Sequence, residues 1–180
     1  VQPAEASLGD AAPLEPYSYR WRLGFGVDRK QGAITDYDTP ALCAGWYHDW
    51  GLQRFPQHPN SMEYVQTVRV SSRHFDLANQ AAYDWAFLDQ CIDANPGSLW
   101  LIGNEPDGNP LQPACDGLTP TAYARVYKVF YDYIKGRDAT AQIANGGIIQ
   151  GSPLRLVWLT RVWDAYKSQN GGAEMPVDVW

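Results

Sequence analysis

The sequence predicts an α/β fold in which parallel strands alternate with helices, and it favours a (β/α)8 TIM barrel of which the first six strands are present. Short apolar runs bounded by turn residues indicate buried strands, and amphipathic stretches between them indicate helices. No Asn-Gly type of turn joins neighbouring strands as in a hairpin. Gly24 and Gly26 lack the third glycine of a dinucleotide-binding fingerprint, so a doubly wound open sheet is the less favoured architecture.

The predicted strands recur along the whole chain. They are expected at residues 21–27, 42–47, 64–70, 98–103, 142–149 and 176–180. The run from Ser98 to Gly103 is the clearest, because it is apolar and lies between the turn formers of 95–97 and the polar residues that begin at Asn104.

Three helices are expected between these strands. The first covers 79–94 and directs Trp85, Leu88 and Ile92 inward. The second has Thr119 as its N-cap and stops at Gly136, with an apolar stripe of Tyr123, Val126, Tyr127, Phe130 and Ile134. The third begins at Ser152 and ends at 170–172, with an inner face of Leu156, Leu159, Trp163 and Tyr166.

The organisation expected is a leader or linker followed by one domain. Residues 1–20 begin with a stretch rich in Ala, Pro and Glu that has no periodicity, which is typical of a flexible segment. Residues 21–180 form the partial barrel. A complete barrel takes about 250 residues, so we expect the chain to be a section of a longer polypeptide or to be completed by a neighbour. An open sheet edge would favour self-association.

Composition excludes several partners and cofactors. Lys and Arg total 14 against 20 Asp and Glu, and the net charge of −6 argues against nucleic acid and anionic membranes. The three histidines and three cysteines show no metal-binding spacing, so no metal or organic cofactor is predicted. At most one disulfide can form within the chain, and we expect Cys91 with Cys115. The 8 Trp and 11 Tyr suit either a large core or a surface that stacks on sugar rings.

The sharpest local feature is the sequence Asn104-Glu105-Pro106-Asp107 after the strand at 98–103. Reactive groups of parallel barrels lie at the carboxyl ends of the strands, which is where Glu105 falls. Glycoside cleavage needs a carboxylic acid that protonates the leaving oxygen, and a neighbouring amide can bind a sugar hydroxyl. The pattern therefore favours a catalytic role for Glu105 over a structural one.

These residues resemble those of a known group of enzymes. The stretch from Trp100 to Asp107 is similar to the fourth-strand signature of the clan A glycoside hydrolases, which are retaining enzymes on a TIM barrel. The resemblance implies that Glu105 is the general acid/base and that Asn104 contacts the sugar 2-hydroxyl. The segment 45–51 resembles the Trp-Tyr-Tyr-Asn-Trp element of the short-barrel endo-β-1,3-glucanase-like family of that clan, with His48 and Asp49 at its third and fourth positions. In the order of its predicted strands, the chain resembles these glycoside hydrolases over about residues 21–180.

Further substrate-binding residues are expected near the ends of other strands. Trp46, His48 and Trp50 are candidates for stacking on a sugar, Trp50 before Trp46, although a Trp in such a place is a core residue about as often. Arg69 occupies a strand end where the resemblance implies an arginine that orients the nucleophile, and a surface ion pair is the alternative. Asp107 and Gln150 are expected in loops, where solvated residues are slightly favoured over substrate contacts.

The leading hypothesis is a retaining hydrolase of β-glycosidic bonds in a polysaccharide, located outside the cell or at its surface. Its nucleophile should lie about 5 Å from Glu105, and we expect it beyond residue 180, on a seventh strand. The alternative is a non-catalytic glycan-binding or structural subunit derived from such a barrel. An open α/β protein that binds dinucleotide or phosphate is the third hypothesis, and the glycine pattern argues against it.

Overall fold

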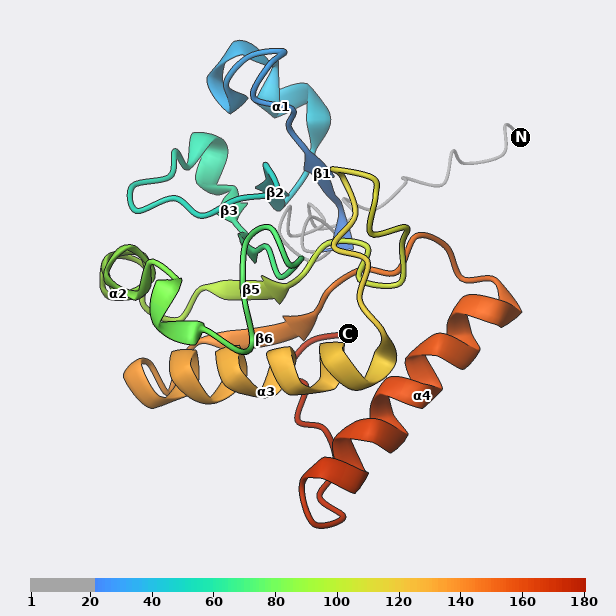
Figure 1. Cartoon of the computed structure of the whole chain (residues 1–180). Helices are drawn as coiled ribbons and strands as arrows, with labels where there is room; N and C mark the ends of the chain where they lie inside the picture. The colour runs from blue at the N-terminus through green and yellow to red at the C-terminus, as the bar shows by residue number, and fades with distance from the viewer. Residues whose placement is uncertain (1–21) are drawn as a thin grey trace, which may run out of the picture.

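A computed structural model describes residues 22–180, so the predicted leader at 1–20 lies outside the described residues. Within residues 22–180 the strands are β1 (Gly24–Gly26), β2 (Trp46–His48), β3 (Glu63–Tyr64), β4 (Gln66–Val68), β5 (Leu99–Ile102) and β6 (Gln142–Asn145). The α-helices of this part of the chain are α1 (Thr39–Leu42), α2 (Trp85–Ala94), α3 (Pro120–Arg137) and α4 (Pro153–Gln169). All strand pairs are parallel, in a sheet β1-β2-β3 and a sheet β4-β5-β6. The α/β fold with parallel strands is confirmed (Figure 1).

A single residue separates the two sheets along the chain. Val65 lies between β3 and β4, and its N–H donates to Tyr47 O at 2.9 Å. The next N–H on that side, that of Thr67, donates to Gly51 O at 2.9 Å. The predicted strand at 64–70 is thus divided between two sheets. The strand predicted at 176–180 is reduced to one parallel bridge between Ala144 and Val179.

Side-chain caps set where the helices begin. The Thr119 hydroxyl accepts from Ala122 N at 3.3 Å, which confirms Thr119 as the N-cap of α3. The predicted start of a helix at residue 79 is wrong. Residues 80–82 form a 3-10 turn, and α2 starts only at Trp85 because the Asp84 carboxylate caps Phe87 N at 2.9 Å. α3 runs one residue past Gly136, to Arg137.

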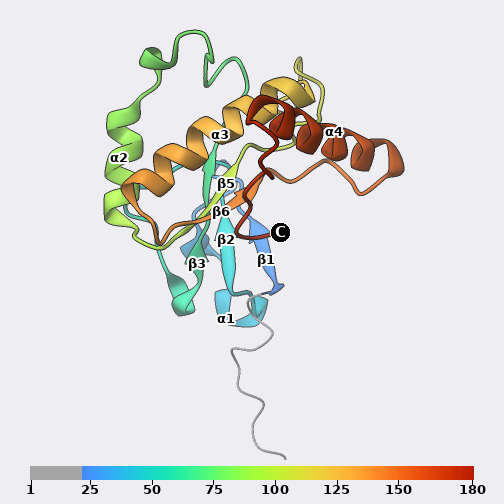
Figure 2. The ribbon, with the colours of Figure 1, turned by 90° about the horizontal axis from the view of Figure 1, so that it is seen from below.

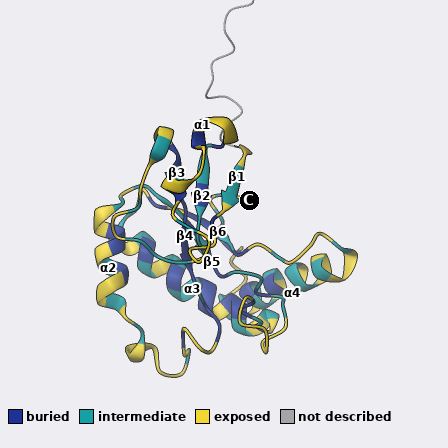
Figure 3. Cartoon of the chain, turned by 90° about the horizontal axis from the view of Figure 1, so that it is seen from above, coloured by how far each residue is buried: buried dark blue, intermediate teal, exposed yellow. Residues whose placement is uncertain are grey.

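Helix α3 supplies much of the core beneath β5 and β6. Its predicted apolar stripe is confirmed, since all five residues are buried: Tyr123, Val126, Tyr127, Phe130 and Ile134. Figure 1 shows α3 running alongside β5 and β6, and Figure 2 shows α3 and α4 on the same side of the strands. In Figure 3 the buried residues gather on the strands and on the inward face of α3.

The predicted inner face of α4 needs a correction. Val162 and Tyr166 are its buried residues, whereas Leu156 is 49% exposed. At about 100° per residue, Leu156 lies about 240° around the helix axis from Val162. It therefore cannot share the face that Val162 and Tyr166, four residues apart, present to the core.

The expected disulfide is also wrong. Cys43, Cys91 and Cys115 are all free thiols. Cys91 is buried in α2 within the main core. Cys115 lies in the loop between β5 and α3 and makes a different contact, described below.

Alternation along β5 gives the second sheet two distinct faces. Trp100 and Ile102 are fully buried in the core that contains α3, whereas Leu99 and Leu101 are only half-buried. Successive side chains of a strand point to opposite faces, so Leu99 and Leu101 point away from that core. In residues 22–180 no helix has the length and apolar character needed to cross a membrane.

Candidate functional site

A cavity of about 980 Å³ opens on the face of the sheets that the helices leave uncovered. Both sheets line it, through Trp46 and His48 of β2, Leu99 and Leu101 of β5, and Ala144 of β6. Loop residues complete the wall, including Trp50, Asn104, Glu105, Gly147 and Trp180. The structure thus brings five of the six predicted site residues to one cavity: Trp46, His48, Trp50, Asn104 and Glu105.

Glu105 has an unusual backbone conformation at the edge of this cavity. Its φ is 45°, in the left-handed region that residues with a side chain adopt rarely. Hydrogen bonds hold it there, because Glu105 N donates to Gly147 O at 3.0 Å and Gly108 N donates to Glu105 O at 2.9 Å. Such conformations cost about 1–3 kcal/mol and gather at functional sites. Trp50, with φ of 59°, is a second such residue at the cavity.

The loop at 113–116 holds the side chains of both Asn104 and Glu105. Asn104 Nδ2 donates to Ala114 O at 2.8 Å. The Cys115 thiol donates to Glu105 Oε2, with 2.9 Å between sulfur and oxygen. Sequence reasoning missed this loop, because nothing in its composition indicates that it returns to the end of β5.

A buried carboxylate fixes this loop to the strands. Asp116 is 1% exposed, and its Oδ2 accepts from Val70 N at 3.1 Å and from Asn104 N at 2.8 Å. Its Oδ1 accepts from Arg69 Nε at 2.9 Å. Arg69 Nη2 also donates to Ala114 O at 2.9 Å. Arg69 does not line the cavity, and its contacts are those of an ion pair that positions the Asn104 backbone.

Three aromatic residues, Trp46, His48 and Trp50, line the cavity from β2 and the loop that follows it. The ring centroids of His48 and Trp50 lie 4.8 Å apart, and those of Trp46 and His48 lie 6.3 Å apart. Trp46 and His48 belong to β2 rather than to the loop after it, whereas Trp50 lies in that loop and is 38% exposed. Burial lowers the pKa of His48, with a smaller opposing effect from Asp49. A neutral imidazole between two indoles suits contact with an uncharged ring such as a sugar.

The carboxylate expected in a loop, Asp107, serves the scaffold, and so does Asp178. Asp107 is a buried side chain whose Oδ2 lies 2.5 Å from Arg155 Nη1. Its other oxygen accepts from Ile149 N at 3.1 Å. Asp178 accepts from Ile143 N and pairs with Lys135, both at 2.8 Å. Gln150 is exposed and is absent from the cavity wall.

Glu63 is a second carboxylate at the cavity that the sequence analysis did not single out. Its Oε1 accepts from Leu99 N at 3.3 Å, at the start of β5. Glu105 follows the other end of that strand, and at ~3.3 Å per residue about 10 Å of backbone separates Leu99 from Ile102. A retaining pair needs about 5 Å and an inverting pair about 6.5–9.5 Å. Glu63 is thus held at the start of β5, whereas Glu105 follows its end.

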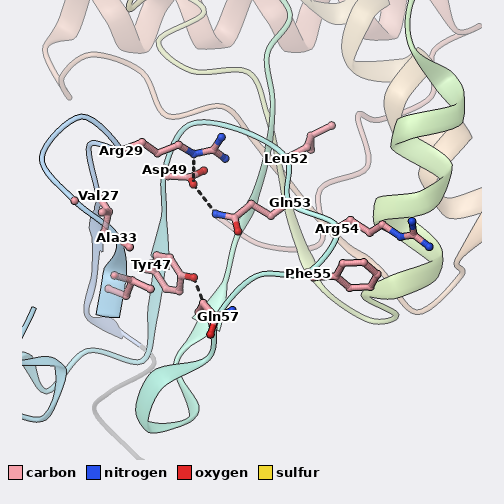
Figure 4. Close-up of a pocket in the computed structure, with 12 residues that line it drawn as sticks. Val27, Arg29, Ala33, Tyr47, Asp49, Leu52, Gln53, Arg54, Phe55 and Gln57 are labelled. Atoms are coloured by element: carbon pink, nitrogen blue, oxygen red, sulfur yellow. Dashed lines mark hydrogen bonds and ion pairs between the residues drawn. The ribbon is translucent and has the colours of Figure 1, made fainter. Parts of the chain in front are cut away.

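A smaller pocket of about 590 Å³ lies near the loop that follows β2. Figure 4 shows Asp49 between Arg29 and Gln53, with donor–acceptor distances of 2.5 and 2.6 Å. Tyr47, which alternates with Trp46 and His48 along β2, donates its hydroxyl proton to Gln57 O at 2.7 Å. The Asp49 carboxylate at the centre of this pocket thus already accepts hydrogen bonds from Arg29 and Gln53, which is typical of a group with a structural role.

The chemistry available at the large cavity is that of carboxylate, amide and aromatic groups. Within the part of the chain that the structure describes, no group of three or more His, Cys, Asp or Glu residues is placed to hold a metal ion. Glu105 can exchange a proton, Asn104 can hydrogen-bond a hydroxyl, and the aromatic residues can stack on a flat ring.

Comparison with known proteins supports the fold. A crystal structure of a GH128 (subgroup II) endo-beta-1,3-glucanase from Pseudomonas viridiflava matches with a TM-score of 0.58 at 18% sequence identity. The match covers 89% of this chain and 59% of the glucanase, so this chain spans less than two thirds of that protein's length. At this identity the likeness concerns the fold alone. No family model matches the sequence, and no curated protein matches it.

Proposed function

We propose that the two sheets are consecutive parts of the wall of one (β/α)8 barrel within a domain at 21–180, and that the large cavity is its interior. The continuous chain through Val65 supports this, because it pairs with β2 on one side and then with β5 on the other. Side chains from one face of both sheets line the same cavity, as the inner face of a barrel would. This arrangement is the one implied by the resemblance to clan A glycoside hydrolases.

The proposed activity is retaining hydrolysis of β-glycosidic bonds in a polysaccharide, for which a β-1,3-glucan is the first substrate to test. Glu105 carries the proposal, since it combines a strained backbone, a position after a parallel strand and a place on the cavity wall. The endo-beta-1,3-glucanase whose fold is similar, at 18% sequence identity, supports the choice of substrate. An enzyme acting on such a polymer works outside the cell or at its surface.

In the proposed mechanism Glu105 acts first as an acid. Its carboxyl proton moves to the glycosidic oxygen while a nucleophilic carboxylate attacks the anomeric carbon, which breaks the C–O bond and forms a glycosyl-enzyme ester. Glu105, now a carboxylate, takes a proton from water, and that water displaces the ester. We place the nucleophile on a strand beyond residue 180, because Glu63 is hydrogen-bonded at the start of β5 and Glu105 follows the end of that strand.

The test is Glu105→Gln in the full-length protein, with Glu63→Gln as the matched control at the other end of the same cavity. Glu105→Gln should lower kcat on β-1,3-glucan by about 10²–10⁴-fold, the usual contribution of general acid–base catalysis. Glu63→Gln should stay within a few-fold of wild type. Calorimetric binding of a β-1,3-gluco-oligosaccharide should be the same in both variants. Unchanged turnover in Glu105→Gln would overturn the proposal.

A second candidate is a non-catalytic glycan-binding subunit, whose open sheet edge would also allow self-association. The aromatic wall of Trp46, His48 and Trp50 favours it, because stacking needs no second carboxylate. Oligosaccharide binding by the full-length wild type without release of new reducing ends would select this candidate. Trp50→Ala should then weaken binding, since Trp50 is exposed at the cavity.

A further inference from the structure

The contact between Cys115 and Glu105 joins a buried thiol to the proposed acid/base. Cys115 is 2% exposed, and its sulfur lies 2.9 Å from Glu105 Oε2. Within residues 22–180, no other side chain donates a hydrogen bond to that carboxylate. The direction of Glu105's side chain therefore depends on this one donor.

The thiol remains a donor at neutral pH. Burial raises the pKa of Cys115, and the hydrogen bond and negative charge of Glu105 raise it further. The negative charge of Asp107 also raises the pKa of Cys115. A protonated thiol can donate to the carboxylate, whereas a thiolate would repel it.

Cys115 is itself held firmly by its neighbours. Asp116, the next residue, is tied to Arg69, Val70 and Asn104 by the hydrogen bonds described above. A Cβ atom added at Gly108 would lie 2.5 Å from Cys115 Cβ, so the glycine lets the two segments pack closely. These contacts of the backbone around Cys115 do not involve the carboxylate of Glu105.

We propose that Cys115 is a positioning residue that selects which oxygen of Glu105 exchanges the catalytic proton. With Oε2 engaged by the thiol, Oε1 is the oxygen that protonates the leaving group and later accepts a proton from water. This inference rests on the proposed function of Glu105. It concerns the orientation of the carboxylate and requires no contact between Cys115 and substrate.

The kinetic test uses Cys115→Ala, Cys115→Ser and, as a matched control, Cys91→Ala in the full-length protein. Cys91 is a buried thiol in α2 that packs in the main core. Cys115→Ala should lower kcat roughly 10-fold with KM unchanged, since small misplacement of a catalytic group is costly. Cys115→Ser should recover most of the loss, because its hydroxyl can donate from the same position. Cys91→Ala should keep the wild-type kcat.

A spectroscopic test depends neither on catalytic activity nor on the folding of the Cys115 variants. The infrared S–H stretching band of Cys115, assigned by subtracting the Cys115→Ser spectrum, should lie at lower frequency than that of an unbonded thiol. It should move to higher frequency in Glu105→Gln, because a carboxamide is a weaker acceptor than a carboxylate. If Cys115→Ser does not fold, the wild-type minus Glu105→Gln difference spectrum decides.

The outcomes separate this inference from the function on which it rests. Full kcat in Cys115→Ala, no recovery in Cys115→Ser, or an S–H band that Glu105→Gln leaves in place overturns the role of Cys115 alone. Wild-type turnover in Glu105→Gln overturns the proposed function, and the role of Cys115 with it.

Discussion

Replacing Tyr123 by Phe tests how the end of β5 is held beneath the candidate site. Tyr123 is fully buried on α3, and its hydroxyl donates to Ile102 O at 2.7 Å and accepts from Gly146 N at 2.8 Å. Ile102 ends β5 shortly before Glu105, and Gly146 follows β6 directly before Gly147, whose carbonyl accepts from Glu105 N. Burial raises the pKa of Tyr123, so the hydroxyl stays protonated and keeps both roles.

The size of the effect follows from the two partners. The Phe ring keeps the packing, but Ile102 O and Gly146 N each lose a partner in a buried place. An unsatisfied buried group costs about 1–3 kcal/mol. Because a carbonyl oxygen has a second lone pair, we take the lower part of that range and expect a loss of about 2–4 kcal/mol in the free energy of unfolding. The midpoint of thermal unfolding should fall by about 4–16 °C.

The assay is urea unfolding of the full-length protein, with Tyr131→Phe as the control. Tyr131 lies on the same helix and is only partly buried. Tyr131→Phe, which removes only the hydroxyl, should change the free energy of unfolding by less than about 0.5 kcal/mol. An equal effect of the two substitutions, or a loss below 1 kcal/mol for Tyr123→Phe, would refute the bridging role of the hydroxyl.

Two further predictions concern pH and backbone packing. Burial lowers the pKa of His48 below 6.5, and burial also lowers that of His74, so the unfolded chain binds protons first as pH falls. The free energy of unfolding should therefore decrease from about pH 7 toward pH 5, and His48→Asn should flatten part of that slope in urea titrations at each pH. At Gly146 a Cβ atom would lie 2.6 Å from Gly103 O and 2.8 Å from Ile102 O, whereas Gly147 has open space. Gly146→Ala should thus lower the free energy of unfolding by about 1–3 kcal/mol, and equal stability of the Gly146 and Gly147 alanine variants would contradict this.

Local patterns predicted the stripe on α3 well, and they failed where a second cap was available or where the packing of a whole helix decided which face is buried. The stripe on α3 is a repeat that only a helix can bury on one side, and Thr119 caps it as expected. The helix expected from residue 79 was wrong because the Asp84 carboxylate offers a cap five residues later. Leu156 is exposed because α4 meets the core along Val162 and Tyr166.

The sequence by itself determined the parallel α/β pattern and the position of Asn104 and Glu105 directly after a buried strand. These follow from hydrophobic periodicity and from turn chemistry, which act between near neighbours in the chain. Only the tertiary structure decided what surrounds that carboxylate. The loop at 113–116 returns to the end of β5 because the buried Asp116 binds Arg69 and two backbone N–H groups, and this places a thiol rather than a disulfide beside Glu105. Contacts of this kind depend on where separate segments meet in space, and no spacing along the chain records them.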